Sequence, residues 1–225
     1  MFENMSEMPI LKATDIFKAY AELEVLKGIN IYVDKGEIIS VVGASGAGKS
    51  TLLHILGSLD QPDKGQLLIN NHDIGGLSRN AMASFRNKQI GFVFQFHNLL
   101  PEFSALENVC IPGYIGRKKQ REVEDRALEL LVLLGLEKRM HHKPSQLSGG
   151  EQQRAAVARA LVNSPAIVFA DEPSGNLDSH NAEELHQLFF DLRKKLDISF
   201  VIVTHNSSLA DMADRKLTIE DGKML

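Results

Sequence analysis

The sequence has a single cysteine and no excess of positive charge. Cys110 is the single cysteine among 225 residues, so no internal disulfide can form. In its apolar surroundings this thiol is expected to be a small core side chain in a reducing compartment. Positive charge is not in excess either, because the formal net charge is -4 and the pI is about 6.1. Without a basic field over the whole chain, we expect no nucleic acid as a partner.

Long apolar segments are also missing. The densest apolar run, residues 127–136, is interrupted by Glu129 and is far shorter than the roughly 20 residues that cross a bilayer. Residues 1–9 are acidic and lack the cationic region and long apolar core of a secretory signal, so we interpret them as a frayed lead-in. We therefore expect a cytoplasmic location and no membrane span within this chain.

The sequence does contain short strands that alternate with helices. Residues 10–20 and 25–33 carry short, partly alternating apolar runs, which are typical of an antiparallel edge layer. Short apolar runs bounded by polar residues fit a parallel sheet covered on both faces. Such strands are predicted at 38–42, 90–94, 166–170 and 200–204. Their alternation with helices predicts an α/β fold.

Between residues 104 and 163 the pattern becomes helical. Apolar residues repeat at helical spacing at Val123, Ala127, Leu130, Leu131 and Leu134. Gly135 suits the end of that helix. The segment predicts a helical lobe inserted in the α/β core. We expect one domain over residues 1–225, with its core at about 10–95 and 164–225 and a helical subdomain at about 96–163.

The strand predicted at 38–42 leads directly into a glycine-rich loop and a helix predicted over 49–59. Glycines let successive backbone N–H groups converge on phosphate oxygens, and the following helix adds the positive end of its dipole. Lys49 is expected to hold the β- and γ-phosphates, and the Ser50 hydroxyl to ligate Mg²⁺. The residues expected to bind the nucleotide here are Gly43, Ala44, Ser45, Gly46, Ala47, Gly48, Lys49, Ser50 and Thr51. The loop predicts a nucleoside triphosphate as ligand and leaves the reaction open.

Two adjacent carboxylates follow another predicted strand. Four apolar residues, 167–170, place Asp171 and Glu172 at its carboxyl end, which is the edge where α/β sheets bind ligands. Asp171 is expected to reach Mg²⁺ through water. Glu172 is placed to polarise an attacking water as a general base. Together with the phosphate loop, this pair predicts triphosphate hydrolysis.

A further motif, Leu147-Ser148-Gly149-Gly150-Glu151, narrows the class. As an isolated string it is typical of a helix N-cap, a role compatible with a functional one. Combined with the phosphate loop, it resembles the signature of the ATP-binding cassette ATPases. The resemblance implies a P-loop NTPase core of the RecA-like type, with an antiparallel β edge layer and an inserted α-helical subdomain, and it implies ATP and Mg²⁺ as ligands. It also implies a homodimer, in which Ser148, Gly149 and Gly150 contact the γ-phosphate bound to the other subunit.

The resemblance gives roles to four further residues. Gln95 resembles the Q-loop glutamine, which senses Mg²⁺ and the attacking water, and is therefore expected among both the catalytic and the metal-binding residues. His205 resembles the switch histidine that contacts the γ-phosphate. Tyr20 resembles the A-loop aromatic that stacks on adenine, although packing within the edge sheet is the alternative. Asp178 resembles the D-loop aspartate at the dimer interface, and it also suits the cap of a helix beginning near His180.

Within the family, three stretches closely resemble the lipoprotein-releasing system ATPases, namely 52–57, 94–109 and 170–178. In that group, the region after the Q-loop glutamine forms a groove for a coupling helix of the membrane subunit. Integral membrane permease subunits are therefore expected to dock near Gln95 to Pro112. This implies a peripheral protein at the cytoplasmic face of the bacterial inner membrane. MacB-type efflux or mechanotransmission ATPases and FtsE-like cell-division ATPases share the scheme and remain alternatives.

Two other classes with phosphate loops fit less well. ATP-switched DNA-repair or chromosome proteins carry a long coiled coil between the two motifs, and the interval from Ser50 to Leu147 is too short for one. Signalling GTPases need a guanine-specific Asn-Lys-x-Asp, whereas Asn87-Lys88 is followed by Gln89 and Ile90.

Overall fold

A computed structural model describes residues 8–225, so the lead-in expected at residues 1–9 lies largely outside the described residues. The strands are β1 Leu11–Tyr20, β2 Leu23–Val33, β3 Ile38–Val42, β4 Lys64–Ile69, β5 His72–Asp73, β6 Ile90–Phe94, β7 Ile167–Asp171, β8 Ser199–Val203, β9 Arg215–Glu220 and β10 Lys223–Met224. The helices are α1 Lys49–Leu56, α2 Arg79–Gln89, α3 Ala105–Ile115, α4 Gln120–Leu133, α5 Gly149–Leu161, α6 Ser179–Leu196 and α7 Ser207–Met212. No helix in this described part is long and apolar enough to cross a membrane.

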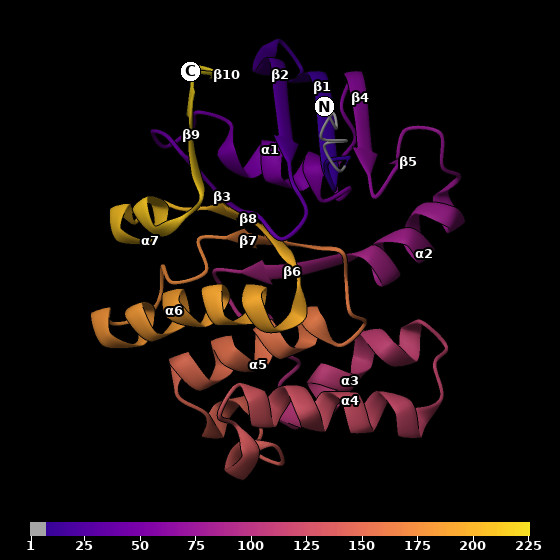
Figure 1. The fold of residues 1–225 in the computed structure, drawn as a ribbon, viewed down its shortest axis with the longest axis vertical. Helices are drawn as coiled ribbons and strands as arrows, with labels where there is room; N and C mark the ends of the chain where they lie inside the picture. The colour runs from indigo at the N-terminus through magenta and orange to yellow at the C-terminus, as the bar shows by residue number, and fades with distance from the viewer. Residues whose placement is uncertain (1–7) are drawn as a thin grey trace, which may run out of the picture.

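The strands form two sheets that lie in separate layers (Figure 1). One is antiparallel, in the order β2-β1-β4-β5, and the other has the order β10-β9-β3-β8-β7-β6. Within the second sheet, β9, β3, β8, β7 and β6 are parallel, and β10 joins the edge antiparallel to β9. In Figure 1 the antiparallel sheet lies above the parallel one, and α3, α4 and α5 lie below. The predicted α/β architecture with an antiparallel layer is therefore observed.

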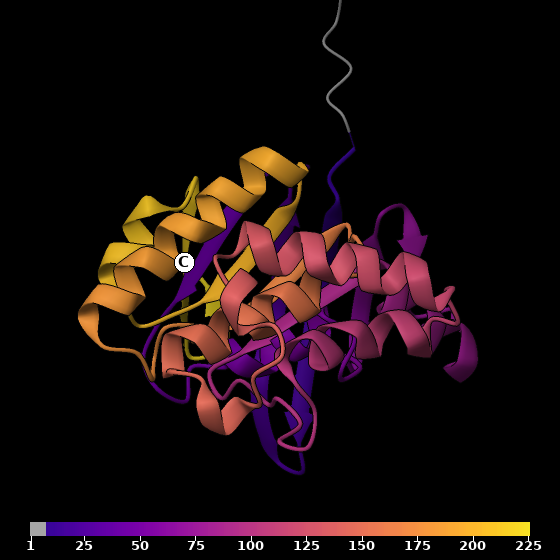
Figure 2. The same ribbon diagram turned by 90° about the horizontal axis from the view of Figure 1, so that it is seen from below.

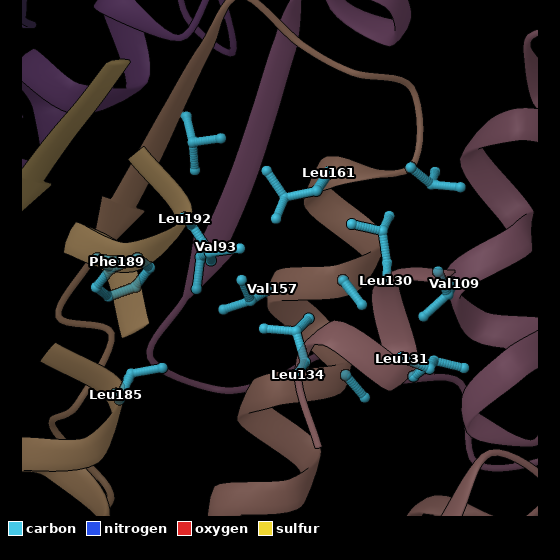
Figure 3. Close-up of a cluster of buried hydrophobic side chains, with 14 of the residues drawn as sticks. Val93, Val109, Leu130, Leu131, Leu134, Val157, Leu161, Leu185, Phe189 and Leu192 are labelled. Carbon is cyan, nitrogen blue, oxygen red and sulfur yellow. The ribbon is translucent and has the colours of Figure 1, made fainter. Parts of the chain in front are cut away.

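The parallel strands are apolar along their length because both faces of the sheet are covered. In β7, Val168 and Ala170 pack into the core shared with α3 to α6, whereas Ile167 and Phe169 pack into the core shared with α1 and the antiparallel sheet. The first of these cores is drawn in Figure 3. Successive side chains of a strand point to opposite faces, so one short apolar run serves two cores.

The three α-helices between residues 105 and 161 pack on one another below the sheet. Seen from below, they form a group beside α6 (Figure 2). Helix α4 ends in a Schellman motif, in which Gly135 has φ +71° and the N–H of Leu136 donates to Leu131 O at 2.8 Å. Cys110 is buried in this group, as expected, and burial raises the pKa of its thiol. The division at about residues 96 and 163 stays a prediction.

Some element boundaries differ from the predictions. The helix predicted over 49–59 ends at Leu56, because Gly57 closes it and Ser58 has φ +56°. The antiparallel layer also contains β4 and β5, which the alternation at 10–33 did not predict. At Gly57 an added Cβ would lie 2.2 Å from the ring of Phe92 on β6, so this close approach is what requires a residue without a side chain.

Candidate functional site

Four parallel strands end at one edge of the central sheet, and predicted site residues follow all four. In the register Phe94 pairs with Asp171, and both Asp171 and Val41 pair with Val203, so β6, β7, β8 and β3 finish nearly level. The residues just beyond these ends are Gly43, Gln95, Glu172 and His205. The topology thus gathers segments that are far apart in the sequence at the edge where α/β sheets bind ligands.

The phosphate loop runs from β3 to the first turn of α1. Gly43 has φ +155° and an added Cβ would lie 2.2 Å from Ile219 O on β9, so the loop starts against a neighbouring strand. Gly48 has φ +102°, and a Cβ there would meet Leu26 Cδ2 at 2.9 Å. Both positions require glycine, and a glycine-rich turn of this kind lets successive backbone N–H groups converge on phosphate oxygens.

Two side chains of α1 face this edge. Lys49 Nζ donates to Gly43 O at 2.9 Å and to Ala44 O at 2.8 Å, which holds the ammonium across the loop. The Ser50 hydroxyl donates to Asp171 Oδ1 at 3.4 Å. Burial raises the pKa of Asp171, and the Ser50 hydrogen bond acts in the opposite direction. A hydroxyl and a carboxylate side by side form the oxygen donor set that Mg²⁺ prefers, so these residues fit the expected metal.

Glu172 and His205 meet directly. Glu172 Oε2 accepts a hydrogen bond from His205 N at 3.1 Å and lies 2.8 Å from His205 Nδ1. Glu172 has φ +46°, an uncommon conformation for a residue with a side chain. Both contacts fall on Oε2, and among residues 8–225 no hydrogen bond to Oε1 is found. A carboxylate held this way retains one oxygen that can accept a proton from water.

Gln95 is held by a residue to which the sequence analysis gave no role. Gln95 Nε2 donates to Asn176 Oδ1 at 3.2 Å, and Asn176 Nδ2 donates back to Gln95 O at 3.1 Å. Two reciprocal amide hydrogen bonds fix the glutamine beside the loop that follows Glu172. Asn176 lies in the stretch 175–178, where the resemblance drew attention to Asp178 instead.

Tyr20 lies at the end of β1 and is half exposed. Its hydroxyl donates to Asp60 Oδ2 at 2.6 Å, and this hydrogen bond raises the pKa of Tyr20. Lys18 Nζ contacts Asp60 Oδ1 at 3.1 Å and lies 5.2 Å from the centre of the Tyr20 ring. The side chain of Thr51, next to the phosphate loop, also neighbours the Tyr20 hydroxyl. The ring is therefore oriented near the loop by Asp60, which the sequence analysis missed.

Within the described part of one chain, Ser148 and Asp178 make their hydrogen bonds at the starts of α5 and α6 and not with the residues at the strand ends. Ser148 caps α5: its hydroxyl accepts from Glu151 N at 3.3 Å, and its own N–H donates to Glu151 Oε2 at 2.7 Å. Asp178 caps α6 by accepting from Asn181 N at 3.0 Å. A Cβ added at Gly150 would lie 2.5 Å from Asn181 Oδ1, so the starts of α5 and α6 are adjacent. Both predicted capping roles are observed.

Comparisons with known proteins identify one family. A family profile described as ABC transporter matches residues 26–175. The chain is 62% identical over 216 residues to the lipoprotein-releasing system ATP-binding protein LolD of Cytophaga hutchinsonii, covering 96% of this chain and 99% of that protein. It is 55% identical over 213 residues to LolD of Bacteroides thetaiotaomicron, covering 95% of this chain and 98% of that protein.

Solved structures of cassettes share the fold. The dimeric post-hydrolysis state of the ATP-binding cassette MJ0796, bound to ADP and Pi, aligns with a TM-score of 0.86 at 39% identity, covering 95% of this chain and 96% of that one. CbiO1 of Clostridium perfringens aligns with a TM-score of 0.88 at 29% identity, covering 96% and 87%. The predicted fold class, a P-loop NTPase core with an antiparallel layer and a helical insertion, is confirmed.

Proposed function

This chain belongs to the ABC transporter family, and we propose that it is the ATP-hydrolysing subunit of a membrane complex that releases lipoproteins from the bacterial inner membrane. The observation that carries the proposal is the 62% identity to a LolD protein over nearly the full length of both chains. The residues at the ends of the parallel strands supply the chemistry. They bring together the phosphate loop, the Ser50 and Asp171 oxygens and the Glu172 carboxylate.

ATP binding relies on positioned backbone and side-chain groups. The loop from Gly43 to Ser50 surrounds the β- and γ-phosphates, Lys49 neutralises part of their charge, and Tyr20 stacks on the adenine. Ser50, Gln95 and Asp171 would hold Mg²⁺, which would neutralise charge on the β- and γ-phosphate oxygens. The partial positive charge at the start of α1 adds to this field.

Hydrolysis uses Glu172 as the general base. Its carboxylate takes a proton from water as that water attacks the γ-phosphate, and the contacts from His205 to Oε2 hold the carboxylate in place. His205 contacts the γ-phosphate, and Gln95, oriented by Asn176, lies beside the same water. Most of the catalysis comes from positioning and charge stabilisation.

Each nucleotide is bound between two copies of the chain. The Ser148 hydroxyl accepts from within its own helix but keeps a proton to donate, and the N–H groups of Gly149 and Gly150 lie in the first turn of α5, where N–H groups lack helical partners. These donors face the γ-phosphate of the second copy. Asp178 lies at the same interface, and closure of the dimer on two ATP molecules moves the helical subdomain, residues 96–163.

The membrane subunits dock on the surface that follows Gln95. Two large apolar side chains in this region, Phe96 and Ile115, are each 69% exposed. Beside them is a cavity of about 210 Å³ lined in part by Phe92, Phe94 and Pro112. Asn87, Arg159 and Asn163 also line this cavity, so it suits an amphipathic helix from a permease, and docking there holds the ATPase at the cytoplasmic face of the inner membrane.

Purification of the tagged full-length chain from membranes, followed by mass spectrometry of what it retains, tests the assignment. Recovery of the integral membrane subunits of a lipoprotein-releasing system, lost in a Phe96→Glu variant that still binds ATP, is the expected outcome. Recovery of cell-division proteins, or of a four-helix permease with a large periplasmic domain, would replace lipoprotein release with one of the alternative functions.

A further inference from the structure

One buried titratable side chain takes no part in the roles above. His186 of α6 is only 2% exposed, and its Nε2 lies 2.9 Å from Ser174 Oγ. Its other ring nitrogen, Nδ1, is buried without a hydrogen-bond partner among the described residues. The neighbouring residues Leu185 and Phe189 belong to the helical core (Figure 3). A buried polar atom without a partner destabilises a fold, so an apolar residue of similar size would suit this position better for stability alone.

The protonation state of His186 follows from its surroundings. Burial lowers the pKa of His186, and the charge of Glu183 acts more weakly in the opposite direction. The ring is therefore neutral near pH 7 and carries one N–H. If the proton were on Nδ1, a buried N–H would have no acceptor, whereas an unpaired nitrogen lone pair is the less costly alternative. We accordingly assign the N–H to Nε2, from which it donates to Ser174.

Ser174 lies in the middle of the loop that joins β7 to α6, and it is only 7% exposed. On one side of Ser174, Glu172 has its positive φ and its carbonyl accepts from Gly175 N at 3.0 Å. On the other side, Asn176 makes the two hydrogen bonds that hold Gln95. A displacement of Ser174 would therefore move both groups that face the attacking water.

We propose that His186 is a positioning residue for ATP hydrolysis: by anchoring Ser174 through Nε2, it holds the loop that sets the Glu172 carboxylate and, through Asn176, the Gln95 amide. The inference rests on the proposed roles of Glu172 and Gln95. This role explains why an imidazole is buried here, because the hydrogen bond to Ser174 needs a donor on a helix face that is otherwise apolar. A positive φ at Glu172 persists only where its surroundings hold it, and this anchor is one such restraint.

Three variants of the full-length chain test the proposal by steady-state ATPase kinetics and thermal melting. His186→Met removes the donor and fills the space, His186→Gln keeps an amide N–H near the position of Nε2, and Ser174→Ala removes the acceptor. We expect His186→Met and Ser174→Ala each to lower kcat about tenfold with little change in KM for ATP, because small misplacements of catalytic groups slow chemistry without weakening binding. The double variant should be no slower than either single variant.

The His186→Gln variant should retain most of the wild-type kcat. The melting temperature of His186→Met should stay close to that of the wild type, because removal of the unpaired nitrogen offsets the loss of the hydrogen bond to Ser174. Gln187→Met is the matched control, since it introduces the same residue at an exposed neighbouring position of α6 and should leave kcat unchanged.

Several results would overturn the proposal. A wild-type kcat in both His186→Met and Ser174→Ala would remove the positioning role. A parallel loss of kcat and melting temperature in His186→Met, with no recovery in His186→Gln, would reduce the residue to a packing role. Glu172→Gln in the same assay distinguishes failure of this inference from failure of the proposed function. If Glu172→Gln is inactive while His186→Met has a normal kcat, only the role of His186 is wrong. If Glu172→Gln is active, the proposed catalytic site itself is wrong.

Discussion

The proposed role of Glu172 as general base predicts that a Glu172→Gln variant still binds ATP but hydrolyses it very slowly. Glutamine has nearly the same shape, so its side-chain oxygen can still accept from His205 N, but the amide cannot take a proton from water. Loss of a positioned general base lowers turnover about 10²- to 10⁴-fold. That range corresponds to about 2.7 to 5.4 kcal/mol of activation free energy. Affinity for ATP should stay the same or increase, because a negative charge is removed from beside the triphosphate.

Phosphate release at saturating ATP and Mg²⁺, together with equilibrium binding of ATP, measures the two quantities separately. Glu220→Gln, at an exposed position of β9, is the control for the substitution itself and should behave as the wild type. Phosphate release close to the wild-type rate in Glu172→Gln would refute the base role. Loss of ATP affinity in parallel with turnover would show that the carboxylate supports binding rather than chemistry.

Three further predictions concern packing, pH and nucleotide affinity. Gly57→Ala places a Cβ 2.2 Å from a phenylalanine ring carbon and should lower the free energy of unfolding by about 1–3 kcal/mol in denaturant titrations, whereas Gly76→Ala, with no atom within 4 Å of the added Cβ, should not. The hydrogen bond from the backbone N–H at the cap of α5 lowers the pKa of Glu151, so its carboxylate stabilises the fold above the ordinary carboxyl pKa of about 4.3. The stability difference between wild type and Glu151→Gln should therefore shrink as pH falls below that value, and a constant difference in melts from pH 6 to 3 would contradict it. Asp60→Asn should raise KM for ATP about threefold with kcat nearly unchanged, because Tyr20 loses its charge-assisted hydrogen bond; equal KM values would remove Asp60 from nucleotide binding.

The features that could be predicted from the sequence are those that depend on residues close together in the chain. Short apolar runs predicted β3, β6, β7 and β8 to within a residue or so, because a strand buried on both faces must be apolar throughout. Ser148 and Asp178 could be predicted as helix caps because capping is a local interaction. The side-chain oxygen accepts a hydrogen bond from a backbone N–H only a few residues later in the sequence.

The features that could not be predicted depend on contacts between distant segments. Asn176 holds Gln95, and Asp60 holds Tyr20, yet nothing near any of these residues in the sequence indicates the pairing. The same applies to the end of α1, since the approach of β6 to Gly57 is a tertiary contact. Backbone topology decides which loop faces which, and local patterns alone do not contain that information.

The central claim is that each ATP is hydrolysed between two copies of the chain, one providing Lys49 and the other Ser148. Mixing a Lys49→Ala chain with a Ser148→Arg chain tests it most directly, because a mixed dimer has one site in which both contributing surfaces are intact. We predict that each variant alone releases almost no phosphate and that the mixture regains activity. Phosphate release from the mixture no greater than the average of the two separate variants, or full turnover by Ser148→Arg alone as a monomer, would contradict the account.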